Sequence, residues 1–203
     1  MTRRNRVTPF GELVAVPDRG TLMGNRGVLH DDDGVIVRFS QVRRWICCLT
    51  AFKGRTRPLM APGSYTELFF LDEATALAAG HRPCFECRRA DAARFREAWA
   101  GAAGREASIG ADALDRVLQD DRLDSPGRMR RWLAASASLP DGTMVAVDGA
   151  AYLRHAGGLR EWTPAGYGAR RSAPATVEVL TPRTIVGAIA AGYAPALHPS
   201  ATS

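Results

Sequence analysis

Short apolar runs separated by turn sequences make up the part of the chain before Asp72. Thr8–Val16 alternates weakly between apolar and polar residues, and Asp33-Gly34, a strong hairpin signal, precedes the apolar run Val35–Phe39. Gln41–Phe52 and Tyr65–Phe70 are rich in the aromatic and branched residues typical of strands. This pattern predicts three or four antiparallel strands ahead of the first helix.

Helical patterns follow. Asp72–Ala79 has Asp72 as a predicted N-cap and stops at Gly80, and Asp91–Ala103 and Ala111–Leu123 have apolar residues three and four positions apart. Ser125-Pro126 predicts the start of a further helix, because serine is a good N-cap and proline suits the first helical position. Trp99 and Trp132 have the spacing of core aromatic residues and are assigned no binding role. The residues expected on the apolar faces of these helices are Phe95, Trp99, Leu114, Val117, Leu118, Met129, Trp132 and Leu133.

After Leu139 the pattern changes to short strand-like segments divided by the turn sequences Asp148-Gly149 and Gly157-Gly158. Thr143–Val147, Ala151–Arg154 and Leu159–Trp162 predict a meander of tight hairpins, and Trp162–Tyr167 predicts a turn with two aromatic residues. Thr176–Leu180 is predicted as a strand. A last helix is expected from Thr181-Pro182 to Ala191, with Gly192 as its stop.

These elements predict an α+β fold: an antiparallel β-rich N-terminal domain, a helical middle, and a small C-terminal β-hairpin unit with a terminal helix. The expected boundaries are residues 1–104, 105–139 and 140–203, and 203 residues are enough to bury a substantial core. Strands alternating with helices around a parallel sheet are not indicated.

The composition is that of a globular protein, with 46% hydrophobic residues and 24% charged residues. No apolar run is long enough to cross a bilayer, and the basic N-terminus lacks the apolar core of a signal peptide. We therefore expect a cytoplasmic protein with no membrane partner, and reduced cysteines rather than a disulfide framework.

The basic residues are unevenly distributed. The net charge is +6, and no acidic residue lies between Arg38 and Arg57. A basic surface of this kind attracts phosphate backbones, although a solvated face is the alternative interpretation. The candidate nucleic-acid contacts are Arg43, Arg44, Lys53, Arg55, Arg57, Arg88 and Arg89.

Cys84 and Cys87 form a Cys-x-x-Cys turn, which can direct two sulfurs at one zinc ion. A redox pair would open a helix after a strand, whereas a helix and a glycine precede this motif, so a metal site is favoured. The two other cysteines, Cys47 and Cys48, are the remaining predicted ligands. Successive residues of a strand face opposite sides, so both reach one ion only if the strand ends or bulges there.

Histidines are the other candidate ligands. His30 sits at a turn that could fold back against the sheet and is a substitute ligand. His81 lies too close to Cys84 for an obvious ligand geometry, and we expect it to pack in the interior.

The region around the Cys-x-x-Cys turn also resembles a known family. The residues concerned are Phe69-Phe70, Asp72-Glu73-Ala74, Ala76-Leu77-Ala78-Ala79-Gly80, Arg82-Pro83-Cys84 and Cys87. Over residues 69–89 they are similar to the zinc-binding domain of Ada-type DNA methylphosphotriester methyltransferases. The resemblance implies a zinc domain within residues 1–104, DNA as a partner, and a zinc-bound thiolate that accepts a methyl group.

The chain departs from that family in two places. Cys47 and Cys48 are adjacent where the family has Cys-x-x-x-Cys, and His81 replaces an aromatic residue. We therefore expect a structural zinc and no methyl transfer, although a zinc-activated thiolate is the alternative role.

Two function classes remain open. The first is a zinc protein that binds nucleic acid in a DNA-repair or regulatory context. The second is a structural zinc protein that mediates protein contacts or acts on a small substrate, without a DNA role. The sequence has no nucleophile elbow, Walker loop or His-Glu-x-x-His motif, so enzymatic activity is left open.

Overall fold

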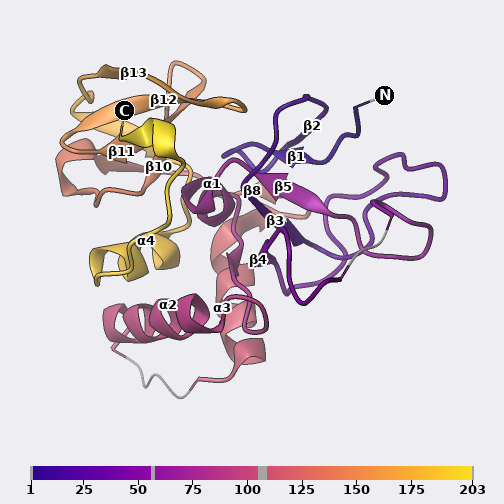
Figure 1. Ribbon diagram of the computed structural model, residues 1–203. Coiled ribbons are helices and arrows are strands. Elements are labelled where there is room, and N and C mark those ends of the chain that lie inside the picture. Colours follow the sequence, from indigo (N-terminus) through magenta and orange to yellow (C-terminus); the bar gives the residue numbers. More distant parts are fainter. Residues whose placement is uncertain (1, 56–57, 105–108, 203) are drawn as a thin grey trace.

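A computed structural model describes residues 2–55, 58–104 and 109–202 of the chain, and it is a mixed α and β structure (Figure 1). The helices in these residues are α1 (Glu73–Ala78), α2 (Arg89–Ala102), α3 (Ala111–Arg122) and α4 (Arg183–Ala190), with 3₁₀ turns at Ser136–Ser138 and Pro199–Ala201. Asp72 caps α1 through its side chain, which accepts a hydrogen bond from the Thr75 N–H. Gly80 follows α1 with a φ of 78°, which confirms the predicted helix stop.

The N-terminal strands of the described chain form one six-stranded sheet in the order β2-β1-β5-β3-β4-β6. Their bounds are β1 Arg6–Val7, β2 Leu13–Val14, β3 Leu22–Asn25, β4 Ile46–Leu49, β5 Leu68–Phe70 and β6 Arg82–Pro83. Three pairings are antiparallel, but β1–β5 and β4–β6 are parallel, so the sheet is mixed and not purely antiparallel. β6 follows α1, and the helix allows the chain to re-enter the sheet parallel to β4.

A second six-stranded sheet in the described residues has the order β13-β12-β11-β10-β14-β9 and is antiparallel throughout. Its strands are β9 Trp132–Ala135, β10 Met144–Val147, β11 Ala150–His155, β12 Gly158–Thr163, β13 Gly166–Arg171 and β14 Thr176–Val179. The predicted meander of hairpins is confirmed in β10, β11 and β12. β13 was not predicted; it begins at Gly166, inside the segment expected to be only a turn.

The prediction of a helix that begins at Ser125-Pro126 is wrong. β7 (Leu123–Ser125) and β8 (Arg128–Met129) form a two-stranded hairpin there, and Trp132 lies in β9. Gly127 has a φ of 79°, a left-handed conformation that suits a tight turn after proline and cannot continue a helix.

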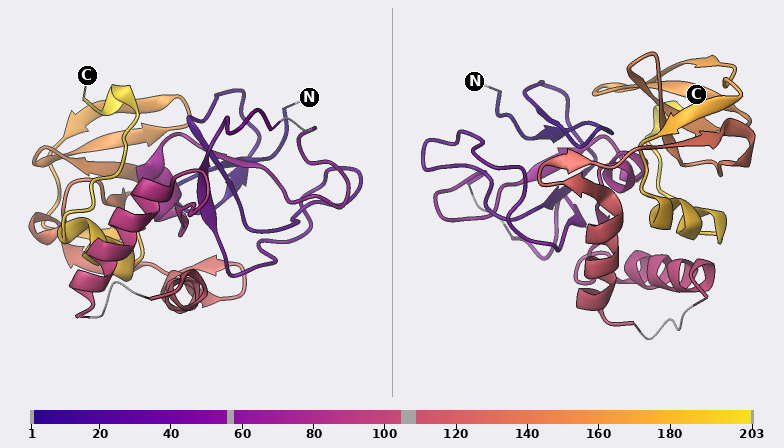
Figure 2. Two further views of the ribbon diagram at one scale, coloured as in Figure 1. Left: turned by 60° about the horizontal axis from the view of Figure 1, so that its bottom comes forward. Right: turned by 180° about the vertical axis from the view of Figure 1, so that it is seen from behind.

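Helix α1 lies between the two sheets and above the other helices (Figures 1 and 2), and every residue of it is buried. Its faces contribute to three separate hydrophobic clusters. Ala74 and Ala78 pack with β10 and β11, Leu77 packs with α2, α3 and α4, and Ala76 packs with the N-terminal sheet. Because α1 is buried on all sides and contributes to all three clusters, it is the element that joins the two halves of the molecule.

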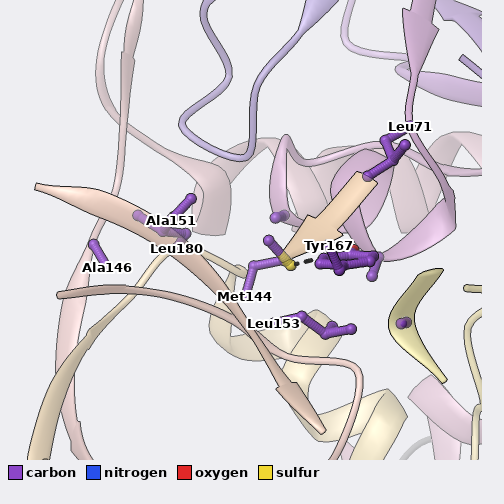
Figure 3. Packing of buried hydrophobic residues seen from close by; sticks show 10 residues of the cluster. Leu71, Met144, Ala146, Ala151, Leu153, Tyr167 and Leu180 are labelled. Carbon is purple, nitrogen blue, oxygen red and sulfur yellow. Dashed lines mark hydrogen bonds between the residues drawn. The ribbon is translucent and has the colours of Figure 1, made fainter. Parts of the chain in front are cut away.

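Figure 3 shows the hydrophobic cluster between α1 and the C-terminal sheet, where the Tyr167 ring points toward Met144. The Tyr167 hydroxyl donates a hydrogen bond of 2.8 Å to the Asp72 carboxylate, which also accepts one from the His198 N–H at 3.1 Å. Asp72 therefore caps its helix and also binds the C-terminal sheet and tail.

Next to the N-terminal sheet, two arginine side chains stack on the ring of Trp45, the residue before β4. The guanidinium carbon of Arg26 lies 4.3 Å from its ring centroid and that of Arg122 lies 3.9 Å from it. All three side chains are fully buried. Cation–π contacts of this kind gain strength away from water, so they fix the start of β4 against helix α3.

The helices of the described residues are all too short or too polar to cross a membrane.

Candidate metal centre

Three cysteine sulfurs converge at the surface of the N-terminal sheet. The Sγ atoms of Cys48, Cys84 and Cys87 all lie within 4.8 Å of one another. Thiolates bound to a tetrahedral zinc at about 2.3 Å stand about 3.8 Å apart, so shifts of about 1 Å or less would bring these sulfurs to ligand positions. The donor set fits zinc, for which thiolate is a preferred ligand.

The parallel pairing of β4 with β6 brings Cys48 and Cys84 together. Ile46 pairs with Arg82 and Cys47 with Pro83, and the Cys84 N–H donates to the Cys47 carbonyl at 2.9 Å. The next residues in this register are Cys48 and Cys84, so their backbones are neighbours although 36 positions separate them in the sequence.

The Cys-x-x-Cys turn presents backbone donors to its own sulfurs. The Glu86 N–H donates to Cys84 Sγ at 3.4 Å, and the Cys84 carbonyl accepts from the Arg88 N–H at 3.1 Å. Strand β6 ends at Pro83, directly before the turn, and helix α2 begins directly after it at Arg89. The expectation that the motif does not open a helix after a strand is therefore wrong, and that argument against a redox pair does not hold. The start of α2 also places the partial positive charge of its N-terminus beside the sulfurs. Donors and dipole both favour sulfur in its thiolate form, the form that binds metals.

The pKa values of the three cysteines depend on one another, because their side chains are hydrogen-bonded together. The hydrogen bond from Cys48 lowers the pKa of Cys84 to about 5, with help from the Cys87 and Glu86 N–H groups and against the effect of burial. The same hydrogen bond, together with burial, raises the pKa of Cys48, and burial raises the pKa of Cys87. The shared hydrogen bond therefore favours the thiolate form at Cys84 and the protonated form at Cys48.

Cys47 lies outside this group. Its side chain is fully buried in the apolar cluster of the N-terminal sheet, and its sulfur accepts a 3.5 Å hydrogen bond from Arg88. Burial raises the pKa of this thiol, which favours the protonated form. Of the four cysteines predicted as ligands, the structure thus brings together three.

The two histidines considered as ligands have other partners. His30 is buried, with Nδ1 2.6 Å from the Thr66 hydroxyl and Nε2 3.4 Å from the Ala61 carbonyl. His81 is fully buried and accepts a hydrogen bond from Arg26 at 3.4 Å, so the expectation that it packs in the interior is confirmed.

Arg88 belongs to a buried network that the sequence reasoning missed. Its guanidinium forms ion pairs with Glu73 at 2.9 Å and Asp91 at 2.7 Å, and its side chain is 4% exposed. Glu73 also accepts hydrogen bonds from the Tyr193 hydroxyl at 2.6 Å and the Ala196 N–H at 2.9 Å. The acidic residue three positions after Arg88 was the available signal for an ion pair.

The other residues predicted to contact nucleic acid differ in their surroundings. Arg43, Arg44, Lys53, Arg55 and Arg89 are exposed, and Arg57 lies outside the described residues. Arg55 forms an ion pair at 2.6 Å with Glu86, one of the two residues between the cysteines of the turn. The loop after β4 is thereby connected to the Cys-x-x-Cys turn.

Comparison of the chain with protein-family models, curated proteins and solved structures gave no match.

Proposed function

We propose that this chain is a zinc-binding protein and that Cys48, Cys84 and Cys87 hold the ion. The observation that carries the proposal is the convergence of three sulfurs within 4.8 Å from two segments far apart in the sequence. Three thiols gathered at one point suit a metal better than a disulfide, which needs only two.

The zinc has a structural role in this proposal. It ties β4 to the turn that leads into α2. The other contacts between these segments include the short β4–β6 pairing, the hydrogen bond from Arg88 to Cys47 and the exposed Arg55–Glu86 ion pair. An exposed ion pair contributes little to stability, whereas metal binding that depends on the folded arrangement adds its free energy to folding.

Metal analysis of the purified protein tests this function. We expect close to one equivalent of zinc per chain without added metal, and its loss in Cys84→Ser and Cys87→Ser. Retention of full zinc by both variants, with unchanged thermal stability, would refute the proposal.

A second candidate function is nucleic-acid binding beside the metal centre, in line with the resemblance to the Ada-type zinc domain. Exposed Arg43 and Arg44 precede the metal-binding strand, and exposed Arg89 opens the helix that follows the turn. Contacts from such residues to phosphates would weaken steeply as salt rises. Absence of DNA and RNA binding at low salt would leave the structural zinc protein, acting through protein contacts or on a small substrate.

A further inference from the structure

The proposed zinc site has three protein ligands in the described part of the chain, whereas tetrahedral zinc takes four. Among residues 2–55, 58–104 and 109–202, no further histidine, cysteine, aspartate or glutamate joins the group of Cys48, Cys84 and Cys87. Closed structural sites have four protein ligands, and sites with three keep one position for an exogenous group.

The side chains best placed to supply a fourth ligand are committed elsewhere. Cys47 precedes Cys48 in an extended strand, so its side chain projects to the opposite side, where Arg88 contacts it. Glu86 lies inside the turn, but its carboxylate is held by Arg55 at 2.6 Å. Both nitrogens of His30 face other partners, Thr66 and Ala61.

The site is also open to solvent. Cys48 and Cys87 are half-buried, so part of each side chain is exposed. A ligand from solution therefore has access to the sulfurs.

The charges at this opening suit an anion. Arg55 is exposed and close enough to Cys87 for their charges to interact, and Lys53 is similarly close to Glu86. Three thiolates around Zn²⁺ give a net charge of about −1. Glu86 neutralises one of the two cations through its ion pair with Arg55, so one positive charge remains to offset a further negative ligand.

We propose that the fourth zinc position is open and binds the thiolate of a small thiol in place of water. This inference rests on the proposed zinc-binding function and names the ligand class of the same site. On binding, the thiol sulfur forms the Zn–S bond, its proton goes to solvent and the bound water leaves, so no oxidant or reductant is needed. Thiolate matches the soft character of the existing ligands better than a carboxylate or phosphate oxygen does.

Cobalt substitution tests this inference, since sulfur-to-cobalt charge-transfer absorption reports the number of bound thiolates. The protein is purified with a phosphine reductant, loaded with Co²⁺ and titrated with 2-mercaptoethanol. We expect charge-transfer absorption to rise by about one third, from three thiolates to four, and to saturate. The matched variant Cys47→Ala should give the same starting spectrum and the same rise.

Two results would overturn the inference while leaving zinc binding intact. One is a cobalt spectrum that does not respond to the thiol. The other is a drop of about one quarter in the starting absorption of Cys47→Ala, as expected if Cys47 were the fourth ligand. A protein that takes up neither cobalt nor zinc would instead reject the metal site itself, and this inference with it.

Discussion

Cys47 and Cys48 are consecutive residues of β4 whose sulfurs have different surroundings: that of Cys48 lies with Cys84 and Cys87, and that of Cys47 contacts Arg88. The pair therefore provides matched variants. Cys48→Ser should lower zinc affinity by more than about 100-fold, because removing a ligand costs more than disturbing its surroundings. Cys47→Ala should keep a full equivalent of zinc. Zinc content after dialysis against a mild chelator measures both, and equal zinc loss in the two variants would contradict the assignment.

Arg88 and its neighbour Arg89 form a second matched pair. Arg88→Met leaves the Glu73 carboxylate buried without its cation, so we expect a loss of about 3–5 kcal/mol in the free energy of unfolding. Arg89→Met changes an exposed side chain and should cost less than about 0.5 kcal/mol. Urea unfolding of the zinc-loaded proteins provides the comparison. If the two losses are similar, the buried network does not have the role assigned to it.

The bond between Tyr167 and Asp72 predicts that Tyr167→Phe destabilises the protein. Removing the hydroxyl takes one donor from a buried carboxylate, at a cost of about 1–3 kcal/mol. Tyr152→Phe is the control, because the Tyr152 hydroxyl only accepts a long 3.4 Å contact from Arg171. Thermal unfolding should place the midpoint of Tyr167→Phe clearly below that of the control, and the reverse order would rule out this contribution.

His81 predicts a specific loss of stability in acid. Burial, with the charges of Arg26 and Arg122, holds its pKa well below the ordinary value of about 6.5. Below pH 6.5 the unfolded chain binds a proton that the folded chain excludes. The free energy of unfolding therefore falls as pH falls, by about 1.4 kcal/mol for each pH unit until the folded pKa is reached.

His81→Phe removes this titration while keeping a ring in the cavity. The stability difference between wild type and variant should therefore shift by about 1.4 kcal/mol, in favour of the variant, between pH 7.5 and pH 5.5. Using the difference cancels the pH dependence of metal binding, which both proteins share. Parallel pH profiles for the two proteins would contradict a neutral, buried His81.

Helix ends that depend on a single capping residue or glycine could be predicted from the sequence. Asp72 and Gly80 delimit α1 as expected, and Gly192 follows α4 with a φ of 103°. The Ser125-Pro126 pair misled because serine followed by proline begins turns as well as helices. Gly127, the next residue, decides between the two through its positive φ.

The full set of metal ligands could not be predicted, because it depends on strand pairings that the spacing of residues in the sequence does not reveal. The Cys-x-x-Cys turn was recognisable, but the choice between Cys47 and Cys48 follows from the β4–β6 register and from which face of β4 is buried. One usable signal was the spacing from Trp45, because residues two apart in a strand share a face. Trp45 is the largest residue of this segment and is buried, so the face that it shares with Cys47 is the buried face of the strand. Arg88 was misjudged as an exposed basic residue because its partner Glu73 is 15 positions away.

The two carboxylates at the start of α1 also constrain the order of events during synthesis. Asp72 and Glu73 are made well before their donors, which include the hydroxyls of Tyr167 and Tyr193 and the N–H group of His198. While the ribosome is still adding those residues, the strands and cysteines of the N-terminal half are already exposed to the cell. The environment of α1 is complete only after residue 198 has been synthesised, so the burial of this helix is a late step in the folding of the chain.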